Sequence, residues 1–533
     1  MNHRLVGTLV LACTGVACRA APAMESPPPG PRAPSLRSEP VVTVAVAREA
    51  EGIRAVFDLP RPMSTVRLQA SPAVRRDAWR LTTARARLAG DTVTSDRPLR
   101  RFEIWIPPDS AEVDRVYPSV HRVGRGVAIY GPALVVAGIE TRVVLRPGPG
   151  EIAIPEVDAV RGYAYLGPAD TLTEGDGFQL VAGESAAPWL VEVVRDETAA
   201  ALAYYRKHLA RAGRRPTILI SADSPGPIGY RGDASDTAVI SLRFFDPRWK
   251  QADPAAAAQL AAFVWHEAFH LWNGQSAAGV PAWLHEGGAE YAAIVAAVDT
   301  GALTQESGIE QVSRHLGRCR AAVGDRSLVT AELSGRAIYS CGVALEWVAD
   351  VEARASSQGR RDVFAIWRDL LERGAGGGYS LDDLRAVTGP TAAAMLDEEG
   401  PGRWDRVVRA LSAHGAQVTQ TVDDDGYRAA ALQHLMAQHC TGGHGFFTEA
   451  TFLRLDTRDT CGPLSGNPEV VAIGGKDLFR APEAAFRVVR RACQARGVVT
   501  LQRRRGKALR VACARPLERP VGLRILSAPA LAR

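Results

Sequence analysis

The spacing of apolar residues changes near Pro188, and this change limits the architectures open to the chain. From residue 41 to about 187, apolar and polar residues tend to alternate, as in Val42–Val46 and Phe102–Ile106, and Gly or Pro interrupts the pattern at short intervals. A period of two is typical of strands that are buried on one face. Residues 41–187 are therefore predicted to form a β-sandwich-like domain.

Helical patterns dominate the middle of the chain. Leu190–Leu209 has the pattern of an amphipathic helix, and two strands are expected at Thr217–Ile220 and Thr237–Leu242. Helical segments then follow from Pro254 to about Leu411. After Asp423 short strands return, with one helix expected near residues 482–495. A chain of 533 residues is too long for one core, so we expect about three or four domains.

The N-terminal residues are typical of an export signal. Leu5–Ala17 is a mainly apolar run, which is long enough for a signal-peptide core and too short to span a bilayer. Cys18 follows this run as at a bacterial lipoprotein cleavage site, and Cys13 is a second candidate acceptor. Ordinary signal cleavage nearby, for instance after Ala21 or Ala23, is the alternative. We therefore predict export to the periplasm or cell envelope, with or without a lipid anchor at Cys18.

Composition excludes some classes of function. Residues 24–40 are rich in Pro and read as an extended tether. The net charge of +6 is spread along the chain, apart from Arg503–Arg505, whereas a nucleic-acid binder concentrates its cations on one face or tail. No later segment has the roughly 18 unbroken apolar residues that a membrane span needs. Because the positive charges are dispersed along the chain, we do not expect nucleic acid to be a partner.

The cysteines after the signal are even in number, which in an exported protein favours disulfides. Pairing of sequence neighbours is the simplest of several connectivities. That pairing joins Cys319 to Cys341, Cys440 to Cys461, and Cys493 to Cys513. No pair has the Cys-x-x-Cys spacing, so a cysteine-based zinc or redox site is not expected.

The run Trp265–Trp272 holds the strongest chemical signal. His266 and His270 are four residues apart, so on a helix they lie on one face and can direct their imidazole nitrogens to one cation. Glu267 stands beside the first histidine and can reach a water on that cation. The Ala-rich stretch Pro254–Val264 supports a helix that begins well upstream. A catalytic zinc usually takes three protein ligands, so a third must come from elsewhere.

A second helix, expected over Pro281–Tyr291, can supply that ligand. Glu286 and Glu290 share one face of it; Glu286 would bind the metal, and Glu290 could accept a hydrogen bond from the far nitrogen of a ligand histidine. Gly287 and Gly288 each weaken a helix by about 1 kcal/mol. We expect them where the backbone approaches the metal or the first helix.

The residues 266–273 and 283–291 together resemble the gluzincin metallopeptidases, closest to the glycyl aminopeptidase family and more distantly to aminopeptidase N. The resemblance implies one zinc ion held by His266, His270 and Glu286, with Glu267 as the catalytic base. Only fifteen residues separate His270 from Glu286, fewer than is usual in those families, so the connecting loop must be trimmed.

The resemblance continues downstream. Ile338–Leu345 is similar to the Tyr-x-x-Gly helix start of these peptidases, where the tyrosine stabilises the oxyanion; that role falls on Tyr339. Without the resemblance, a packed core tyrosine is the alternative. The Gly-Ala-Met-Glu-Asn strand of aminopeptidase N relatives has no counterpart, and Gly229–Ala234 stands roughly in its place, so aminopeptidase specificity is not carried over. Thr237–Leu242 is the expected edge strand for an extended peptide.

The C-terminal region has a likeness of its own. Glu469–Lys476, Pro482–Phe486 and Val498–Gln502 resemble the second half of a PDZ domain, as relatives of the glycyl aminopeptidases often carry. Gly445–Phe447 would then be the loop that receives a peptide carboxylate.

Two weaker signals have ordinary explanations. His434, His439, Cys440 and His444 lie close in sequence, but their spacing matches no zinc pattern, so a polar connector is expected. Arg231–Asp233 spells a cell-adhesion tripeptide, which chance explains in a chain of this composition.

These observations predict a multidomain α+β chain that acts as an exported zinc-dependent metallopeptidase on a peptide or protein substrate. The alternatives are an inactive zinc-bound fold that serves as a PDZ-type peptide-binding scaffold, and a structural envelope protein without metal. The expected parts are a signal peptide (1–23), a linker (24–40), a β-sandwich-like domain (41–187), a thermolysin-like catalytic domain (188–300), a helical domain (301–422) and a PDZ-like domain (423–533).

Overall fold

The computed structural model describes residues 41–532, except 70–73, 110–116, 156–161, 210–214, 223–228, 235–237, 246, 275–279, 334, 377, 442–443, 450 and 458–460. The predicted signal peptide, the Pro-rich linker and Cys18 lie outside the described residues. Among the helices that are described, none is long and apolar enough to cross a membrane.

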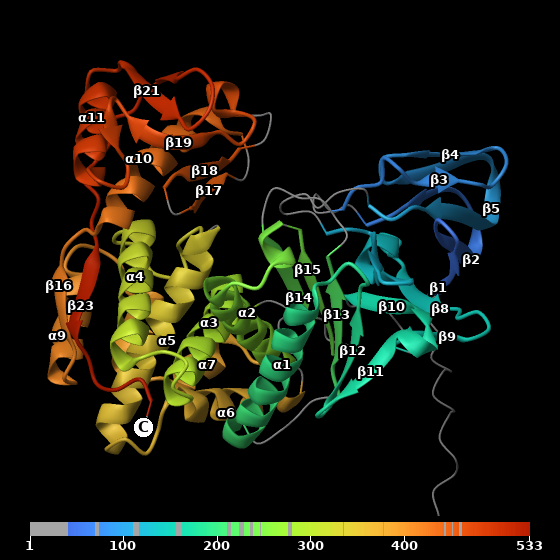
Figure 1. The fold of residues 1–533 in the computed structure, drawn as a ribbon, viewed down its shortest axis with the longest axis horizontal. Coiled ribbons are helices and arrows are strands. Elements are labelled where there is room, and N and C mark those ends of the chain that lie inside the picture. Colours follow the sequence, from blue (N-terminus) through green and yellow to red (C-terminus); the bar gives the residue numbers. More distant parts are fainter. Residues whose placement is uncertain are drawn as a thin grey trace, which may run out of the picture. The chain divides into compact units, whose positions relative to one another are not determined.

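The N-terminal part is β-rich, as the alternating pattern predicts (Figure 1). One sheet has the order β3-β5-β2-β1-β8, with β4 paired to β5, and a second has the order β6-β7-β10-β9. Alternation buries Val42, Val44 and Val46 of β1 in a core that the two sheets share. The bounds are β1 (Val41–Glu49), β2 (Gly52–Arg67), β3 (Arg80–Leu81), β4 (Ala86–Ala89), β5 (Thr92–Ile106), β6 (Val120–Val123), β7 (Gly126–Tyr130), β8 (Glu140–Leu145), β9 (Glu151–Ile154) and β10 (Tyr163–Pro168).

A third, five-stranded sheet carries the candidate site. Its order is β11-β12-β13-β15-β14, and β12, β13 and β15 run parallel while β11 and β14 are antiparallel edge strands. The prediction of an edge strand at Thr237–Leu242 is therefore wrong, because β15 is hydrogen-bonded on both sides and β14 forms the edge. The bounds are β11 (Leu172–Gly175), β12 (Phe178–Ala182), β13 (Thr217–Ser221), β14 (Tyr230–Ala234) and β15 (Val239–Phe244).

The two faces of this sheet pack against different parts. Ile218, Ile220 and Leu242 point into the large core formed with the helices, whereas Leu219 and Val239 on the opposite face pack with tyrosines of β10. Because β11 and β12 belong to this sheet, it begins at Leu172, before the boundary that we expect at Pro188.

Helices cover the chain from 254 to 413, as the sequence pattern predicts. In α2, the side chain of Asp253 accepts hydrogen bonds from the backbone N–H groups of Ala255 and Ala256, and Pro254 stands in the first turn, which explains the start of the helix. The bounds are α1 (Pro188–Leu209), α2 (Pro254–Asn273), α3 (Ala282–Asp299), α4 (Gln305–Val323), α5 (Arg336–Ser357), α6 (Val363–Arg373), α7 (Leu381–Val387), α8 (Pro390–Asp397) and α9 (Arg403–Ala413).

Glycines let α3 and α5 cross at close range. A Cβ atom on Gly287 would collide with the backbone of Gly342 on α5, and one on Gly288 would collide with the Trp367 ring of α6. The expectation that these glycines make room for the metal or for the first helix is therefore wrong. They admit α5 and the indole instead, and this crossing brings the start of α5 to the site.

The C-terminal unit has its own core, formed mainly by α10, α11 and the sheet β17-β18-β19-β21-β22. Helix α11 lies near the position predicted from the sequence, whereas α10 is not predicted. The last strand, β23, leaves this unit: it pairs with β16, and Leu523 and Ile525 join the large core, so the predicted 423–533 unit ends before it. The bounds are β16 (Gln417–Gln420), α10 (Asp424–His439), β17 (Gly445–Thr448), β18 (Leu453–Asp456), β19 (Glu469–Ile473), β20 (Lys476–Asp477), α11 (Pro482–Gln494), β21 (Val498–Arg503), β22 (Leu509–Ala512) and β23 (Leu523–Ser527).

All three disulfides join the sequence neighbours that we predict: Cys319–Cys341, Cys440–Cys461 and Cys493–Cys513. The first links α4 to α5 and the others lie in the C-terminal unit. Such bonds persist in oxidising compartments, which agrees with an extracellular or periplasmic protein.

Candidate metal centre

Helix α2 places His266 and His270 one turn apart, with both side chains buried. Their Nε2 atoms are 3.2 Å from each other. Two nitrogens bound to one zinc at about 2.0–2.1 Å in tetrahedral geometry would be about 3.3 Å apart. The two imidazoles therefore already have the spacing of ligands to one ion.

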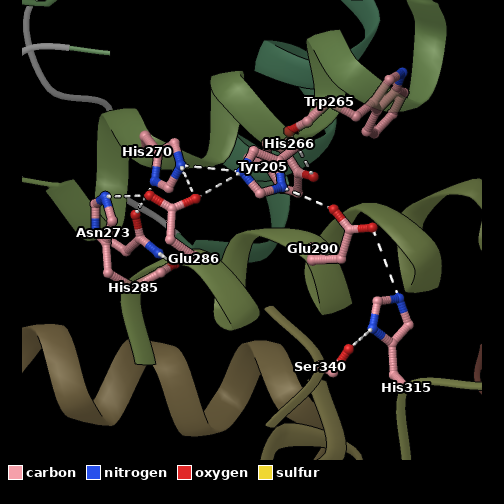
Figure 2. Close-up of polar contacts among 10 residues, drawn as sticks. All are labelled: Tyr205, Trp265, His266, His270, Asn273, His285, Glu286, Glu290, His315 and Ser340. Atoms are coloured by element: carbon pink, nitrogen blue, oxygen red, sulfur yellow. Dashed lines mark hydrogen bonds and ion pairs between the residues drawn. The ribbon is translucent and has the colours of Figure 1, made fainter. Parts of the chain in front are cut away.

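Helix α3 brings the third group to the same point (Figure 2). The Oε2 atom of Glu286 lies 3.3 Å from Nε2 of His266 and 3.8 Å from Nε2 of His270. One ligand atom from each of these residues lies within 4.8 Å of the others. Two imidazole nitrogens and one carboxylate oxygen form a donor set that catalytic zinc sites use. The residues therefore fit the ion that the sequence predicts.

The far nitrogen of each histidine has its own acceptor. His266 Nδ1 lies 3.0 Å from Oε2 of Glu290, as we predict for a ligand histidine, and His270 Nδ1 lies 2.9 Å from Oδ1 of Asn273. When each Nδ1 donates to its acceptor, each Nε2 keeps its lone pair for a cation.

Asn273 is part of the site, although it is not among the site residues predicted from the sequence. It is fully buried, and its side-chain amide donates to the backbone carbonyl of His285 at 2.8 Å. Its position three residues after His270 places it beside that ring on the helix, and this spacing was the available signal.

Burial and mutual contacts shift the pKa values of the residues in this cluster. Burial alone would lower the pKa of His266, but hydrogen bonds to Glu286 and Glu290 outweigh burial and raise it to about 10. Burial, together with the charges of His285 and His266, lowers the pKa of His270 to about 3. The contacts of Glu286 with the two histidines outweigh its burial and lower its pKa to about 2. A cation that binds here must displace the proton on His266.

Glu267 is buried beside the ligands on α2. Burial raises its pKa to about 8; the charge of His266 opposes this shift, and the charges of Glu286 and Asp233 add to it. Glu267 therefore lies beside the ligand histidines on the same helix, and its role as the base stays a prediction.

The edge strand β14 passes directly over Glu267. A Cβ atom on Gly232 would collide with the Glu267 carboxylate and with the ring of Phe263, so any larger residue here would force these side chains to move. The next residue, Asp233, forms an ion pair of 2.6 Å with Arg243 on β15. We attribute the match of Arg231–Asp233 to the cell-adhesion tripeptide to chance. In the structure, Gly232 and Asp233 make contacts beside Glu267 and with β15.

Tyr339 lies in the first turn of α5, and its ring is 5.9 Å from that of His266, centroid to centroid. With 37% of its surface exposed, it is not the packed core tyrosine that we weigh as the alternative. Burial of its hydroxyl side and the carboxylates of Glu286 and Glu267 hold its pKa well above the usual value. The phenol therefore stays protonated and can donate a hydrogen bond toward the metal position.

The neighbouring histidines have structural roles. The ring of His285 stacks on that of His270 at 4.1 Å.

In the C-terminal unit, His434 and His439 each contact a backbone carbonyl, at 2.9 and 2.6 Å, and Cys440 is in a disulfide. His434 and His439 belong to helix α10, so the prediction of a polar connector is wrong for these two residues.

No protein-family model matches the sequence, and no curated protein matches it. Among solved structures, an aminopeptidase N family protein from Idiomarina loihiensis superposes with a TM-score of 0.55 at 13% identity, over 91% of this chain and 98% of that one. The match to an M1 zinc metallopeptidase from Deinococcus radiodurans covers 68% of this chain and 93% of that chain at 14% identity. Its TM-score of 0.39 is too low to establish a shared fold. At such identities the first likeness shows the fold alone: the chain has a fold similar to that of an aminopeptidase N family protein.

Proposed function

We propose that this protein is a zinc-dependent peptidase that holds one ion by His266, His270 and Glu286. The observation that carries the proposal is the convergence of these three side chains, with Glu267 buried beside them. The fold similarity to an aminopeptidase N family protein supports the same class of function.

A bound zinc ion would supply Lewis acidity, which makes water more acidic and a peptide carbonyl more electrophilic. Glu267 is placed to take the proton from the attacking water and then to deliver it to the leaving amine. Tyr339, as a protonated phenol, donates a hydrogen bond to the oxygen that becomes negative in the transition state. Glu290 and Asn273 keep the two imidazoles in the orientation that binding requires.

The edge strand β14 is the proposed place for the substrate backbone. An extended peptide can add to an exposed sheet edge through main-chain hydrogen bonds. Because Gly232 brings that edge against Glu267, a peptide paired there would lie next to the proposed base. This arrangement suits peptide bonds in an extended chain, whether the cut is terminal or internal.

The three disulfides support the proposal that the enzyme works outside the cytoplasm, in the periplasm or cell envelope. Anchoring by a lipid on Cys18 is part of this proposal. Mass spectrometry of the mature N-terminus tests it, because a diacylglycerol adduct and a plain cleaved terminus differ in mass.

The test of the function compares the parent with Glu267→Gln. Elemental analysis should find one zinc per chain in both proteins, because Glu267 is not a ligand. The parent should cleave a peptide library and lose this activity to a chelator, whereas the variant should be slower by roughly 10²–10⁴-fold. A parent that contains no stoichiometric zinc, or a variant as fast as the parent, would contradict the proposal. The positions of the cuts, terminal or internal, define the specificity.

A second candidate function concerns the C-terminal unit. The prediction that Gly445–Phe447 forms a carboxylate-binding loop is wrong, because these residues belong to β17, which is an edge strand of the described sheet. We propose that a peptide C-terminus pairs with β17 in the manner of a PDZ domain, either beside catalysis or, in an inactive protein, in place of it. Full-length Glu267→Gln should then bind peptides with a free C-terminus more tightly than their amidated forms. Equal binding of the two forms would contradict this role.

A further inference from the structure

A line of polar contacts leads from the metal ligands to α4 and α5 (Figure 2). Glu290 uses Oε2 for His266, and its Oε1 lies 3.8 Å from Nε2 of His315 on α4. The other nitrogen of His315, Nδ1, lies 3.2 Å from the hydroxyl of Ser340 on α5. Ser340 directly follows Tyr339, the proposed oxyanion donor.

His315 is held in one protonation state. Its side chain is 14% exposed, and burial lowers its pKa to about 4; the charge of Glu290 opposes this shift, while Arg318, Arg336 and Arg314 add to it. A neutral imidazole has a single N–H group. If Ser340 donates to Nδ1, that N–H is on Nε2 and points to the carboxylate of Glu290.

A covalent link fixes the same two helices. The disulfide Cys319–Cys341 joins α4 to α5, one helical turn after His315 and directly after Ser340. The contact between His315 and Ser340 is therefore made between elements that cannot move apart at this level. Glu290, in contrast, has a side chain that is 35% exposed, and a neighbour at its Oε1 atom restricts the orientation of the carboxylate.

We propose that His315 is a positioning residue of the metal centre: it orients Glu290, and through it His266, and its contact with Ser340 ties the ligands to the helix that carries Tyr339. The inference rests on the proposed function and adds a residue beyond the ligands and their direct partners. His315 contacts Glu290 and Ser340 and not a metal ligand, so its effect on the metal position passes through Glu290.

The experiment compares His315→Ala and His315→Gln with the parent, and His414→Ala, directly after α9, is the histidine control. Two readouts report on the ion rather than on turnover: the rate at which a chelator removes zinc, and the visible spectrum of the cobalt-substituted protein. Loss of an outer partner of a ligand typically costs about 10–100-fold in metal affinity. We expect a loss of this size and a changed cobalt spectrum in His315→Ala. His315→Gln should recover most of the affinity, because its amide can donate to Glu290, and His414→Ala should match the parent.

If His315→Ala melts at a lower temperature but keeps the zinc affinity and cobalt spectrum of the parent, its role is only structural and the proposal is overturned. Should that variant fail to fold, Ser340→Ala replaces it, because removal of the hydroxyl leaves the imidazole in place; unchanged affinity and spectrum would again overturn the proposal. A parent that binds no zinc defeats the proposed function itself, whereas a zinc-binding parent with indifferent variants defeats only this inference.

Discussion

Two clusters in the described part of the chain bring three metal-binding side chains within reach of one another. His266, His270 and Glu286 form the first, and His434, Cys493 and Cys513 form the second; in each, the ligand atoms lie within 4.8 Å. They differ in what those atoms already do. In the second, the two sulfurs are bonded together and Nε2 of His434 lies 2.9 Å from the carbonyl of Arg515.

In the first cluster, the partners occupy the far side of each ring. Glu290 and Asn273 take the Nδ1 atoms, which leaves the Nε2 atoms directed at each other and at Glu286. Proximity of suitable residue types is therefore not enough for a metal site. The contrast shows that the site depends on which lone pairs the surrounding residues leave available.

Removal of a ligand from the first cluster should have the largest effect. Glu286→Ala leaves two imidazoles without a counter-charge, so bound zinc should fall from one per chain to near none and peptidase activity to background. His434→Ala is the control from the second cluster and should keep both. Elemental analysis and a peptide assay check this, and zinc loss in the His434 variant would erase the distinction between the clusters.

Loss of the oxyanion donor should come next. Tyr339→Phe removes one hydroxyl and no ligand, so zinc content should be unchanged while kcat falls by roughly 10²–10³-fold. Steady-state kinetics with KM and kcat measured separately checks the prediction. A variant with the kcat of the parent would show that Tyr339 contributes no oxyanion stabilisation.

Removing the disulfide of the second cluster tests whether this cluster contributes to metal binding. The sequence separation of Cys493 and Cys513 is 20, and cross-linking a loop of that length stabilises a fold by about 3 kcal/mol in the chain-entropy model. Replacing both cysteines by Ala should lower the free energy of unfolding by about this amount and leave zinc content unchanged. Urea denaturation measures the first quantity and elemental analysis the second. A loss of zinc would mean that this cluster also contributes to binding.

A smaller effect should appear in the pH dependence of the metal-free protein. The folded-state pKa of His266 is raised to about 10, so the stability from its proton is present below about pH 6.5 and is lost as the pH rises toward 10. Glu267, raised to about 8, acts in the same direction up to that pH, because the unfolded chain releases its proton near pH 4.5. Each proton contributes at most about 1.4 kcal/mol per pH unit.

Zinc takes the place of the His266 proton, so the zinc-loaded protein should lack this loss. The difference in melting temperature between zinc-loaded and chelator-treated protein should widen from pH 6.5 to 9, as followed by thermal unfolding monitored by circular dichroism. Groups elsewhere titrate equally in both forms and cancel. A difference that stays constant or narrows over this range would contradict the proton occupancy of the first cluster.

Local spacing explains what could be predicted. The α2 ligands follow from helical periodicity, and the Glu-bearing second helix from its Pro start and shared face, because both depend on contacts within a few residues. The predicted pairing of neighbouring cysteines is confirmed. It could also be predicted from spacing, because short stretches of chain bring these cysteines together. In contrast, β14 has no alternation of polar and apolar residues, so its sequence does not mark it as a strand. Its place at the sheet edge depends on pairing with β15.

The sequence by itself determined the donor set, the proposed base and the succession of β-rich and helical regions, because these depend on residue types at short fixed spacings. Tertiary structure alone decided that Gly287 admits α5, that Gly232 lets the edge strand approach Glu267, and that His315 lies next to Glu290. Those contacts join segments far apart in the chain or depend on how buried side chains turn, so packing of the whole core settles them. Residue spacing carries no record of that packing.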